Sequence, residues 1–218
     1  PLMAQQVAFD NICHEHKYYY SLTNLITLLD NFGFEVMDCQ LNDVNGGSFR
    51  LYIMKKEADK TKFGSQPHRD VATIRIHSLI DYEEYIGIDD SDYWMNFYER
   101  IKELKRQLFW FCYDAKAEGK KIWAYGASTK GNTLLQYCEL DNKLIDGIAE
   151  RNMDKWGLRT VGTNIPIYPE EKMRAEKPDY LLILPWHFIN EFKERESEYL
   201  NGGGKFIVPM PVFEIIGA

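Results

Sequence analysis

The chain has 218 residues, of which 27% are charged and 45% hydrophobic, and its net charge at pH 7 is −7. The composition is that of an ordinary globular protein. Binding to nucleic acids or anionic membranes requires an excess of basic residues, which this chain lacks. No apolar run approaches the roughly 20 residues that span a bilayer. No signal-peptide pattern opens the chain, and its four cysteines form no C-x-x-C pair, so a cytoplasmic protein without a disulfide framework or zinc ribbon is expected.

Two histidines around a glutamate form the first notable motif. Residues 7–12 have the β-branched and aromatic character of a strand. If the strand continues, His14 and His16 share one face and Glu15 points to the other, with the phenols of residues 18–20 following. Imidazole exchanges protons near neutral pH, so proton abstraction is the favoured interpretation. A metal pair without an evident third ligand and a purely structural pair remain as alternatives.

A helix and a strand hairpin are predicted next. Ser21 is a good N-cap for the helix, and Gly33 is suited to end it. Residues 34–39 and 48–53 are predicted strands joined by a turn at residues 45–47. This order could be the closing edge of a larger sheet, and its open strand edges would favour pairing between chains and thus a homo-oligomer.

The second half of the chain alternates between strands and helices. Residues 56–92 are polar and turn-rich and are predicted to be a linker, and a long helix is predicted over 93–117. Four predicted strands follow, at 121–125, 145–148, 180–184 and 206–208, with helices at 132–137 and 188–200. The alternation predicts an α/β fold with a Rossmann-like parallel sheet and flanking helices.

A glycine turn separates the first of these strands from its helix. It runs from Gly126 to Gly131, and Asn132 stands where a P-loop has lysine, so nucleotide hydrolysis is not indicated. Backbone N–H groups at a helix N-terminus favour an anion. Ser128, Thr129 and Lys130 are therefore candidate phosphate ligands, although a turn that merely needs small residues would look similar.

Trp186 and His187 end the third strand of this α/β region. Open α/β sheets bind ligands at the carboxyl ends of their strands, so both side chains are candidates to line a pocket. Trp186 could equally belong to the core.

Three segments, taken together, resemble one family. Residues 9–22 (FDNICHEHKYYYSL), 123–135 (WAYGASTKGNTLL) and 178–211 (PDYLLILPWHF to GGGKFIVPMP) look like the C-methyltransferases that act on nucleotide-linked 4-keto-deoxysugars. Residues 46–50 and 162–167 resemble that family too, so the similarity covers nearly the whole chain in order.

The resemblance implies a domain organisation. By this resemblance, a complete member consists of three domains. They are an N-terminal zinc-binding domain, a central S-adenosylmethionine domain and a C-terminal Rossmann-like domain. Residues 1–55 would be the closing part of the central, truncated methyltransferase domain, residues 56–92 a linker, and residues 93–218 the C-terminal domain. The family's zinc cysteines and its glycine-rich S-adenosylmethionine loop have no counterpart in this sequence.

The resemblance also implies a mechanism. A base removes the proton next to the sugar ketone, and the carbon then takes the methyl group of S-adenosylmethionine. By position in the motif, His16 is the base, Glu15 assists it, and His14 is the next candidate. Cys13 stands where some members carry tyrosine. The partner implied is a nucleotide-diphosphate sugar bound at residues 126–132, Trp186 and His187.

Two other functions remain open from the sequence. One is a nucleotide-sugar-binding module without chemistry. The other is an NAD-dependent oxidoreductase, for which Glu150 follows the second strand where dinucleotide folds place a ribose-binding acid.

Overall fold

The computed structural model describes residues 1–217, which form two compact units. Unit 1 contains Pro1–Gln5 and Lys17–Tyr98, and unit 2 contains Gln6–His16 and the chain from Glu99 onward. This division differs from the one predicted from the sequence, because residues 6–16 belong with the second half of the chain.

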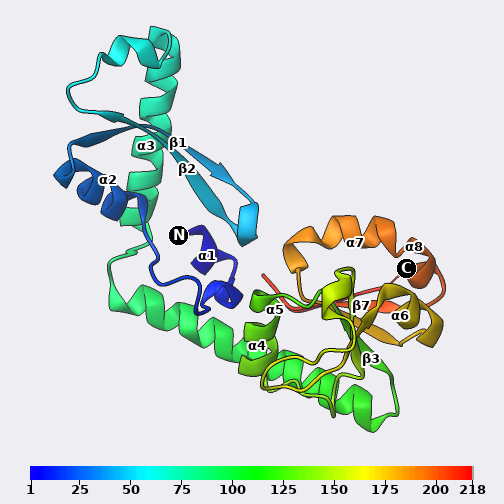
Figure 1. The fold of residues 1–218 in the computed structure, drawn as a ribbon. Helices are drawn as coiled ribbons and strands as arrows, with labels where there is room; N and C mark the ends of the chain where they lie inside the picture. The colour runs from blue at the N-terminus through cyan, green and yellow to red at the C-terminus, as the bar shows by residue number, and fades with distance from the viewer. Residues whose placement is uncertain (218) are drawn as a thin grey trace. The chain divides into compact units, whose positions relative to one another are not determined.

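Unit 1 is an antiparallel hairpin packed against helices (Figure 1). Its elements are α1 (Leu2–Gln5), α2 (Leu22–Asn31), β1 (Phe34–Asn42), η2 (Val44–Gly46), β2 (Ser48–Lys55), η3 (Lys60–Phe63), α3 (Gln66–Tyr85) and the start of α4 (Ser91–Ala117). The Ser21 hydroxyl accepts a hydrogen bond from the Asn24 N–H at 3.1 Å, and Gly33 follows α2 with φ of +76°, so both predicted ends of this helix are confirmed.

The polar segment predicted as a linker contains the 20-residue helix α3. Leu79 of α3 is buried with Leu22 and Cys39, and Ile76 and Ile80 pack against that cluster. The segment resembled a linker because only a narrow apolar stripe of α3 faces the hairpin, while most of its other residues are exposed and polar.

Two buried carboxylates fasten the elements of unit 1. Asp38 on β1 accepts hydrogen bonds from Nε and Nη2 of Arg75 on α3, at 2.8 and 2.7 Å. Glu83, near the end of α3, accepts the N–H groups of Leu22 and Thr23 at 2.6 and 3.0 Å. A carboxylate at a helix N-terminus satisfies donors that the helix itself leaves unpaired. Both residues are only about 1% exposed.

Unit 2 is an α/β unit. Its elements are η1 (Phe9–Asn11), the remainder of α4, β3 (Ile122–Tyr125), α5 (Thr129–Tyr137), β4 (Gly147–Glu150), η4 (Met153–Lys155), β5 (Ile167–Pro169), α6 (Glu170–Glu176), β6 (Tyr180–Ile183), η5 (Trp186–Phe188), α7 (Ile189–Arg195), α8 (Ser197–Asn201), β7 (Lys205–Val208) and β8 (Glu214–Ile216).

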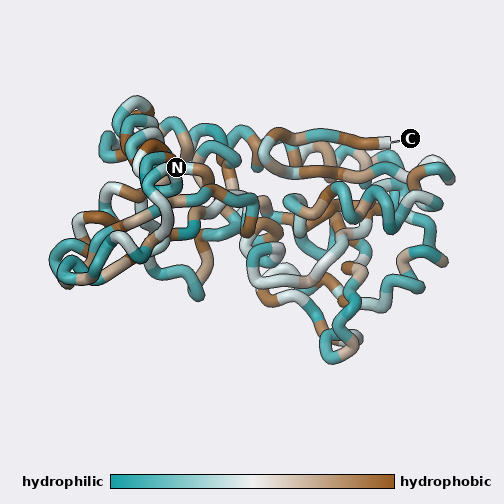
Figure 2. The backbone as a smooth tube through the Cα atoms, turned by 90° about the horizontal axis from the view of Figure 1, so that it is seen from above, coloured by the Kyte–Doolittle hydropathy of each residue, from teal (hydrophilic) through white to brown (hydrophobic). Residues whose placement is uncertain are grey.

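The six strands of unit 2 form one sheet in the order β5-β4-β3-β6-β7-β8. Neighbouring strands from β5 to β7 are parallel, and β8 is antiparallel to β7. Every residue of β3 is buried, as expected for a sheet covered on both faces. Figure 2 shows hydrophobic stretches along the two strands that lead to the C-terminus. The predicted Rossmann-like α/β fold is confirmed, and β5, α6 and β8 are additional to the elements predicted.

The helix predicted over 188–200 is divided at Glu196 into α7 and α8. Glu196 is 2% exposed, and its carboxylate accepts hydrogen bonds from the Tyr125 hydroxyl at 3.1 Å and from Nη2 of Arg174 at 2.5 Å. This network joins the central strand to α6 and explains why a glutamate is buried in this position.

The predicted strand over residues 7–12 is wrong. The segment has Val7 at φ of +54°, the short 3-10 helix η1, and then a turn in which the His16 N–H donates to the Cys13 carbonyl at 3.0 Å. The apolar residues at 7, 9 and 12 break the two-residue period of a strand, and this was the signal against one. His14 and His16 therefore lie on a turn, where the alternation of a strand does not apply.

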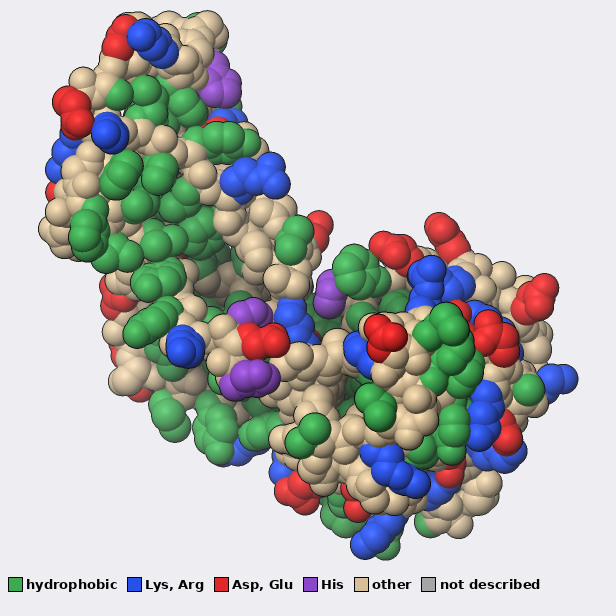
Figure 3. All heavy atoms as spheres, viewed as in Figure 1, with side chains coloured by type: hydrophobic (Ala, Val, Ile, Leu, Met, Phe, Trp, Pro, Cys, Tyr) green, Lys and Arg blue, Asp and Glu red, His purple; other side chains and the backbone are tan. Residues whose placement is uncertain are grey.

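Lysine, arginine, aspartate and glutamate side chains are interspersed on the face shown in Figure 3, while hydrophobic side chains gather over α2 and the adjoining hairpin of unit 1. Among residues 1–217, no helix has both the length and the apolar character needed to cross a membrane.

Replacing Arg75 by leucine tests the ion pair of unit 1. Because Asp38 would stay buried without its partner, we expect unit 1 to lose local stability. Hydrogen exchange of the β1 and α3 amides measures this loss. Arg50→Leu, on the exposed part of β2, is the matched control and should change little.

The same pair predicts a pH dependence. The hydrogen bonds from Arg75 lower the pKa of Asp38, so the stabilisation is present above the ordinary aspartate pKa of about 3.9 and disappears only as pH falls through the lowered native value. Amide protection in wild-type β1 should thus persist at pH 4. Loss of protection already at pH 5 would contradict this assignment.

Candidate functional site

The carboxyl ends of β3 and β6 lie at the topological switch point of the sheet in unit 2. From β3 the chain adds β4 and β5 on one side, and it then adds β6 and β7 on the other side. Open α/β sheets bind ligands in the crevice at such a point. The loops that border it here are the glycine turn after β3 and residues 184–187 after β6.

The glycine turn lies against the loop after β6. Gly126 has φ of +85°, and a Cβ atom there would lie 2.7 Å from the Pro185 ring. A Cβ on Gly131 would lie 3.0 Å from the Leu184 side chain. Glycine is therefore required at both positions for the two loops to approach. Ser128 is the N-cap of α5, with its Oγ accepting the Gly131 N–H at 3.0 Å.

Glu150 shapes this turn. Its Oε2 accepts the Ala127 N–H at 2.7 Å, its Oε1 accepts the Asn152 N–H at 2.9 Å, and the Lys155 ammonium lies 3.7 Å away. Because both carboxylate oxygens already bind backbone N–H groups, the side chain is not poised to bind a ribose hydroxyl pair. The geometry gives no support to the NAD-dependent alternative.

Polar atoms without partners gather where η1, α5 and the β6 loop supply side chains. The buried atoms without a hydrogen bond here are Oδ1 of Asp10, Nζ of Lys130, Oδ1 of Asn132 and Nδ1 of His187. Within residues 1–217 only one further buried side-chain polar atom, on Glu170, shares this condition. Buried polar groups are normally paired, so these atoms make the region a candidate site for a polar ligand.

Asp10, Lys130 and His187, which we call the switch-point cluster, affect one another's pKa. Burial lowers the pKa of Lys130, and the negative charge of Asp10 opposes that change. Burial also lowers the pKa of His187, and the positive charge of Lys130 lowers it further. Burial raises the pKa of Asp10, against the effect of its hydrogen bond from Trp186. Shifts of this kind accompany functional sites.

Trp186 contacts two members of the cluster, Asp10 and His187. The side chain is 4% exposed, and its Nε1 donates to Oδ2 of Asp10 at 3.1 Å. Its ring lies edge-on to that of His187, with 5.6 Å between the centroids. The indole N–H, the single polar group of the Trp186 side chain, is therefore hydrogen-bonded inside the protein.

The His-Glu-His turn follows η1 directly, and the side chains of His14, Glu15 and His16 are exposed. The Nδ1 atom of His16 lies 2.8 Å from the Asn11 carbonyl oxygen, which also accepts the Cys13 N–H at 2.9 Å. A carbonyl only accepts, so neutral His16 must carry its proton on Nδ1. Its Nε2 atom then has the free lone pair that a general base needs.

Metal ligands are not gathered in this structure: nowhere in residues 1–217 do three or more His, Cys, Asp or Glu side chains lie close enough to hold an ion. The four cysteines are free thiols.

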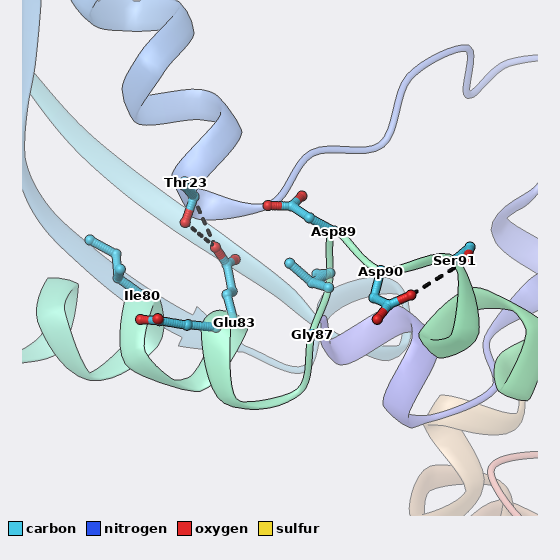
Figure 4. Close-up of a pocket in the computed structure, with 9 residues that line it drawn as sticks. Thr23, Ile80, Glu83, Gly87, Asp89, Asp90 and Ser91 are labelled. Atoms are coloured by element: carbon cyan, nitrogen blue, oxygen red, sulfur yellow. Dashed lines mark hydrogen bonds between the residues drawn. The ribbon is translucent and has the colours of Figure 1, made fainter.

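A second hollow lies in unit 1 and is acidic (Figure 4). It has a volume of about 840 Å³ and is lined by Thr23, Ile80, Glu83, Glu84, Gly87, Ile88, Asp89, Asp90 and Ser91. The Glu83 carboxylate is engaged with the start of α2, and Asp90 caps the start of α4 through the Asp92 N–H at 3.0 Å. These carboxylates fasten helices, so the hollow offers no separate chemistry.

The sequence-predicted residues fall into two groups within unit 2. Lys130 and His187 lie in the switch-point cluster, whereas at the start of α5 Ser128 is exposed and Thr129 and Asn132 are half-buried. The sequence analysis missed Asp10, the acid that completes the cluster. An aspartate between apolar residues 7, 9 and 12 was the available signal.

Comparison with known proteins agrees with this picture. Residues 43–211 match the family model for the C-methyltransferase C-terminal domain. Over 210 residues the chain is 32% identical to C-methyltransferase NovU of Streptomyces niveus. The aligned region covers 96% of this chain and 48% of NovU. The chain thus spans about half the length of this curated relative. The resemblance to the C-terminal portion of a C-methyltransferase is confirmed.

Replacing Trp186 by phenylalanine tests the link between Trp186 and Asp10. Both Asp10 oxygens would be buried and unpaired, so unit 2 should lose about 1–3 kcal/mol of stability. Urea unfolding measures this loss, with Trp110→Phe, on the exposed side of α4, as the control.

Acidification should reduce the effect of Trp186→Phe. The pKa of Asp10 is raised in the native state, so the cost of burying its charge is full above that raised pKa, declines as pH falls below it and is gone below the ordinary aspartate pKa of about 3.9. A penalty that is constant from pH 8 to pH 4 would show that the hydrogen bond to Asp10 is not its cause.

Proposed function

Since the chain belongs to the C-methyltransferase C-terminal domain family, we propose that it is the C-terminal portion of an S-adenosylmethionine-dependent enzyme that methylates a carbon of a nucleotide-linked 4-keto-deoxysugar. The observation that carries this proposal is the position of the His-Glu-His turn. The turn begins four residues after Asp10 and is bound to Asn11 through His16, so one segment supplies both an acid of the switch-point cluster and the candidate base.

The nucleotide diphosphate is proposed to bind at the start of α5. The N-terminus of this nine-residue helix favours an anion, and Gly126 and Gly131 permit close approach of the backbone. Lys130 supplies the positive charge, and Ser128, Thr129 and Asn132 supply polar groups at the same helix end. His187 and the buried Trp186 border the cluster from the loop after β6.

The proposed chemistry begins with a proton. A 4-keto group makes the hydrogen on the neighbouring C3 acidic, because the resulting charge is delocalised onto the ketone oxygen as an enolate. The Nε2 lone pair of His16 takes this proton and forms an imidazolium, while the C–H electron pair enters the enolate. Glu15 is proposed to assist beside the substrate, and His14 is the alternative base. Cys13, as a thiol, is a weak partner for the ketone oxygen, so a neighbouring phenol is proposed there.

S-adenosylmethionine would supply an electrophilic methyl group for the enolate carbon. The described residues of unit 1 form an antiparallel hairpin with helices, without a parallel strand that leads through a glycine-rich turn into a helix. They do not fit this cofactor, so no step is derived through it for this chain.

The cellular setting is also a proposal. We propose a cytoplasmic enzyme with no nucleic-acid or membrane partner, consistent with the acidic balance of the chain. The hairpin of unit 1 pairs with no other strand within the described residues, so its two edges favour a homo-oligomer. A non-catalytic nucleotide-sugar-binding module is the second candidate, because the switch-point cluster alone would suffice for it.

Lys130→Met tests the nucleotide site. Loss of one charge-assisted contact costs about 1.5–3 kcal/mol, so the affinity for a dTDP-sugar should fall about 10- to 100-fold. Isothermal titration calorimetry of the 218-residue chain measures this change. Lys143→Met, an exposed lysine of the same unit, is the matched control. Equal affinities for wild type and Lys130→Met would remove Lys130 from the site.

His16→Gln in the full-length protein tests the base. General-base catalysis contributes about 10²–10⁴-fold, so deuterium exchange at sugar C3 without methyl donor should slow by that factor. The folding of the variant should be unchanged, because the His16 side chain is exposed. His77→Gln, an exposed histidine of α3, is the control. Exchange at the wild-type rate would direct attention to His14 or to a tyrosine among residues 18–20.

A further inference from the structure

Asp10 is a charged residue where a neutral one would suffice for folding. Its carboxylate is 2% exposed, and one oxygen accepts the Trp186 indole N–H at 3.1 Å while the other has no partner. An asparagine could accept the same hydrogen bond without the cost of burying a charge. The negative charge of Asp10 therefore needs an explanation beyond the support of Trp186.

Lys130 provides that explanation. Its ammonium is buried without a hydrogen bond in the first turn of α5, and burial of this kind favours loss of the proton. The 3-10 helix η1, which carries Asp10, packs against α5, which carries Lys130. The Asp10 carboxylate is the principal group that counteracts the loss of the proton, and Cys13 has a smaller effect in the same direction. The carboxylate thus preserves the positive charge that an anion would contact.

The backbone of η1 connects Asp10 to the histidine turn. Asp10 is the middle residue of η1, and the next residue, Asn11, presents the carbonyl that binds Nδ1 of His16 at 2.8 Å. The side-chain amide of Asn11 donates to the Ala8 carbonyl at 3.1 Å, and the Phe9 ring lies 5.1 Å from that of Tyr137 on α5. Any displacement of Asp10 therefore displaces the carbonyl that orients His16.

We propose that Asp10 is a positioning residue that serves both parts of the site: its carboxylate stabilises the Lys130 ammonium for the substrate diphosphate and anchors the turn that orients His16. This inference rests on the proposed function, in which Lys130 binds the diphosphate and His16 is the base. Asp10 contacts neither the diphosphate nor the reacting carbon and acts through these two neighbours.

Asp10→Asn is the variant that tests the proposal, since it retains an acceptor for Trp186 and removes only the charge. Asp146→Asn is the matched control, because Asp146 is a carboxylate of the same unit that binds the Ile122 N–H at 3.0 Å at the opposite end of β3. Two measurements on the 218-residue chain need no ligand. One is the pKa of Lys130 by ¹⁵N NMR, and the other is the tautomer of His16 by imidazole ¹⁵N chemical shifts.

In wild type we expect His16 to be protonated on Nδ1 in its neutral form. Asp10→Asn keeps the anchor and loses the charge, so we expect a lower pKa of Lys130 and an unchanged His16 tautomer. Asp10→Ala also loses the acceptor for Trp186, so in that variant we expect a mixture of both His16 tautomers, whereas Asp146→Asn should match wild type in both respects. An unchanged Lys130 pKa in Asp10→Asn, or an unchanged His16 tautomer in Asp10→Ala, would overturn the proposal. A purely structural role of Asp10 would leave the Lys130 pKa of Asp10→Asn unchanged.

Binding of dTDP by calorimetry completes the test. We expect Asp10→Asn to bind about 10-fold more weakly, and we expect the double variant with Lys130→Met to bind no more weakly than Lys130→Met alone, because Asp10 acts through Lys130. Tighter binding by Asp10→Asn would mean that Asp10 mainly repels the diphosphate, and it would overturn the proposal. Absence of dTDP binding by wild type would instead overturn the proposed nucleotide site, and the two NMR signals would still decide the role of Asp10.

Discussion

The hydrogen bond between the Trp186 indole and the Asp10 carboxylate is the contact on which the candidate site depends. Residues 6–16 contribute no strand to the sheet of unit 2 and join it through one short 3-10 helix. A segment so short gains little from its own backbone hydrogen bonds. Burial of Phe9 against Tyr137 and the anchoring of Asp10 therefore account for the position of the histidine turn in unit 2.

Carboxylates also join neighbouring elements elsewhere in the chain. Glu83 satisfies the first N–H groups of α2, Glu150 accepts the Ala127 N–H beside the glycine turn, and Glu196 joins β3 to α6. Each of them accepts at least two hydrogen bonds from the protein. Asp10 differs, since only one of its oxygens has a partner within the described residues. Glu170 also has one unpaired oxygen, but its other oxygen accepts a hydrogen bond from the Arg174 guanidinium at 2.8 Å, whereas Asp10 is bonded, among residues 1–217, only by the neutral indole of Trp186.

The sequence predicted those parts of the fold whose signals are local. Unbroken apolar runs gave β3 and β6, and the capping residues Ser21 and Gly33 gave the ends of α2. It could not give α3, because the stripe that packs on the hairpin is narrow and its partners lie far away in the chain. The candidate site was predicted only in part for the same reason. Lys130 and His187 follow strands, whereas Asp10 joins them through a contact with Trp186 that spans 176 residues.

The charges of the cluster explain why both signs are needed at an anion site. A lysine buried alone would tend to lose its proton, and a neutral amine attracts a diphosphate only weakly. A carboxylate close by preserves the charge, but one that bound Lys130 directly would compete with the ligand for its three donors. In this structure the Lys130 ammonium has no hydrogen bond, and Asp10 already accepts one from Trp186. The arrangement leaves the donors of Lys130 available while its positive charge is maintained, which is the condition that the proposed diphosphate site has to meet.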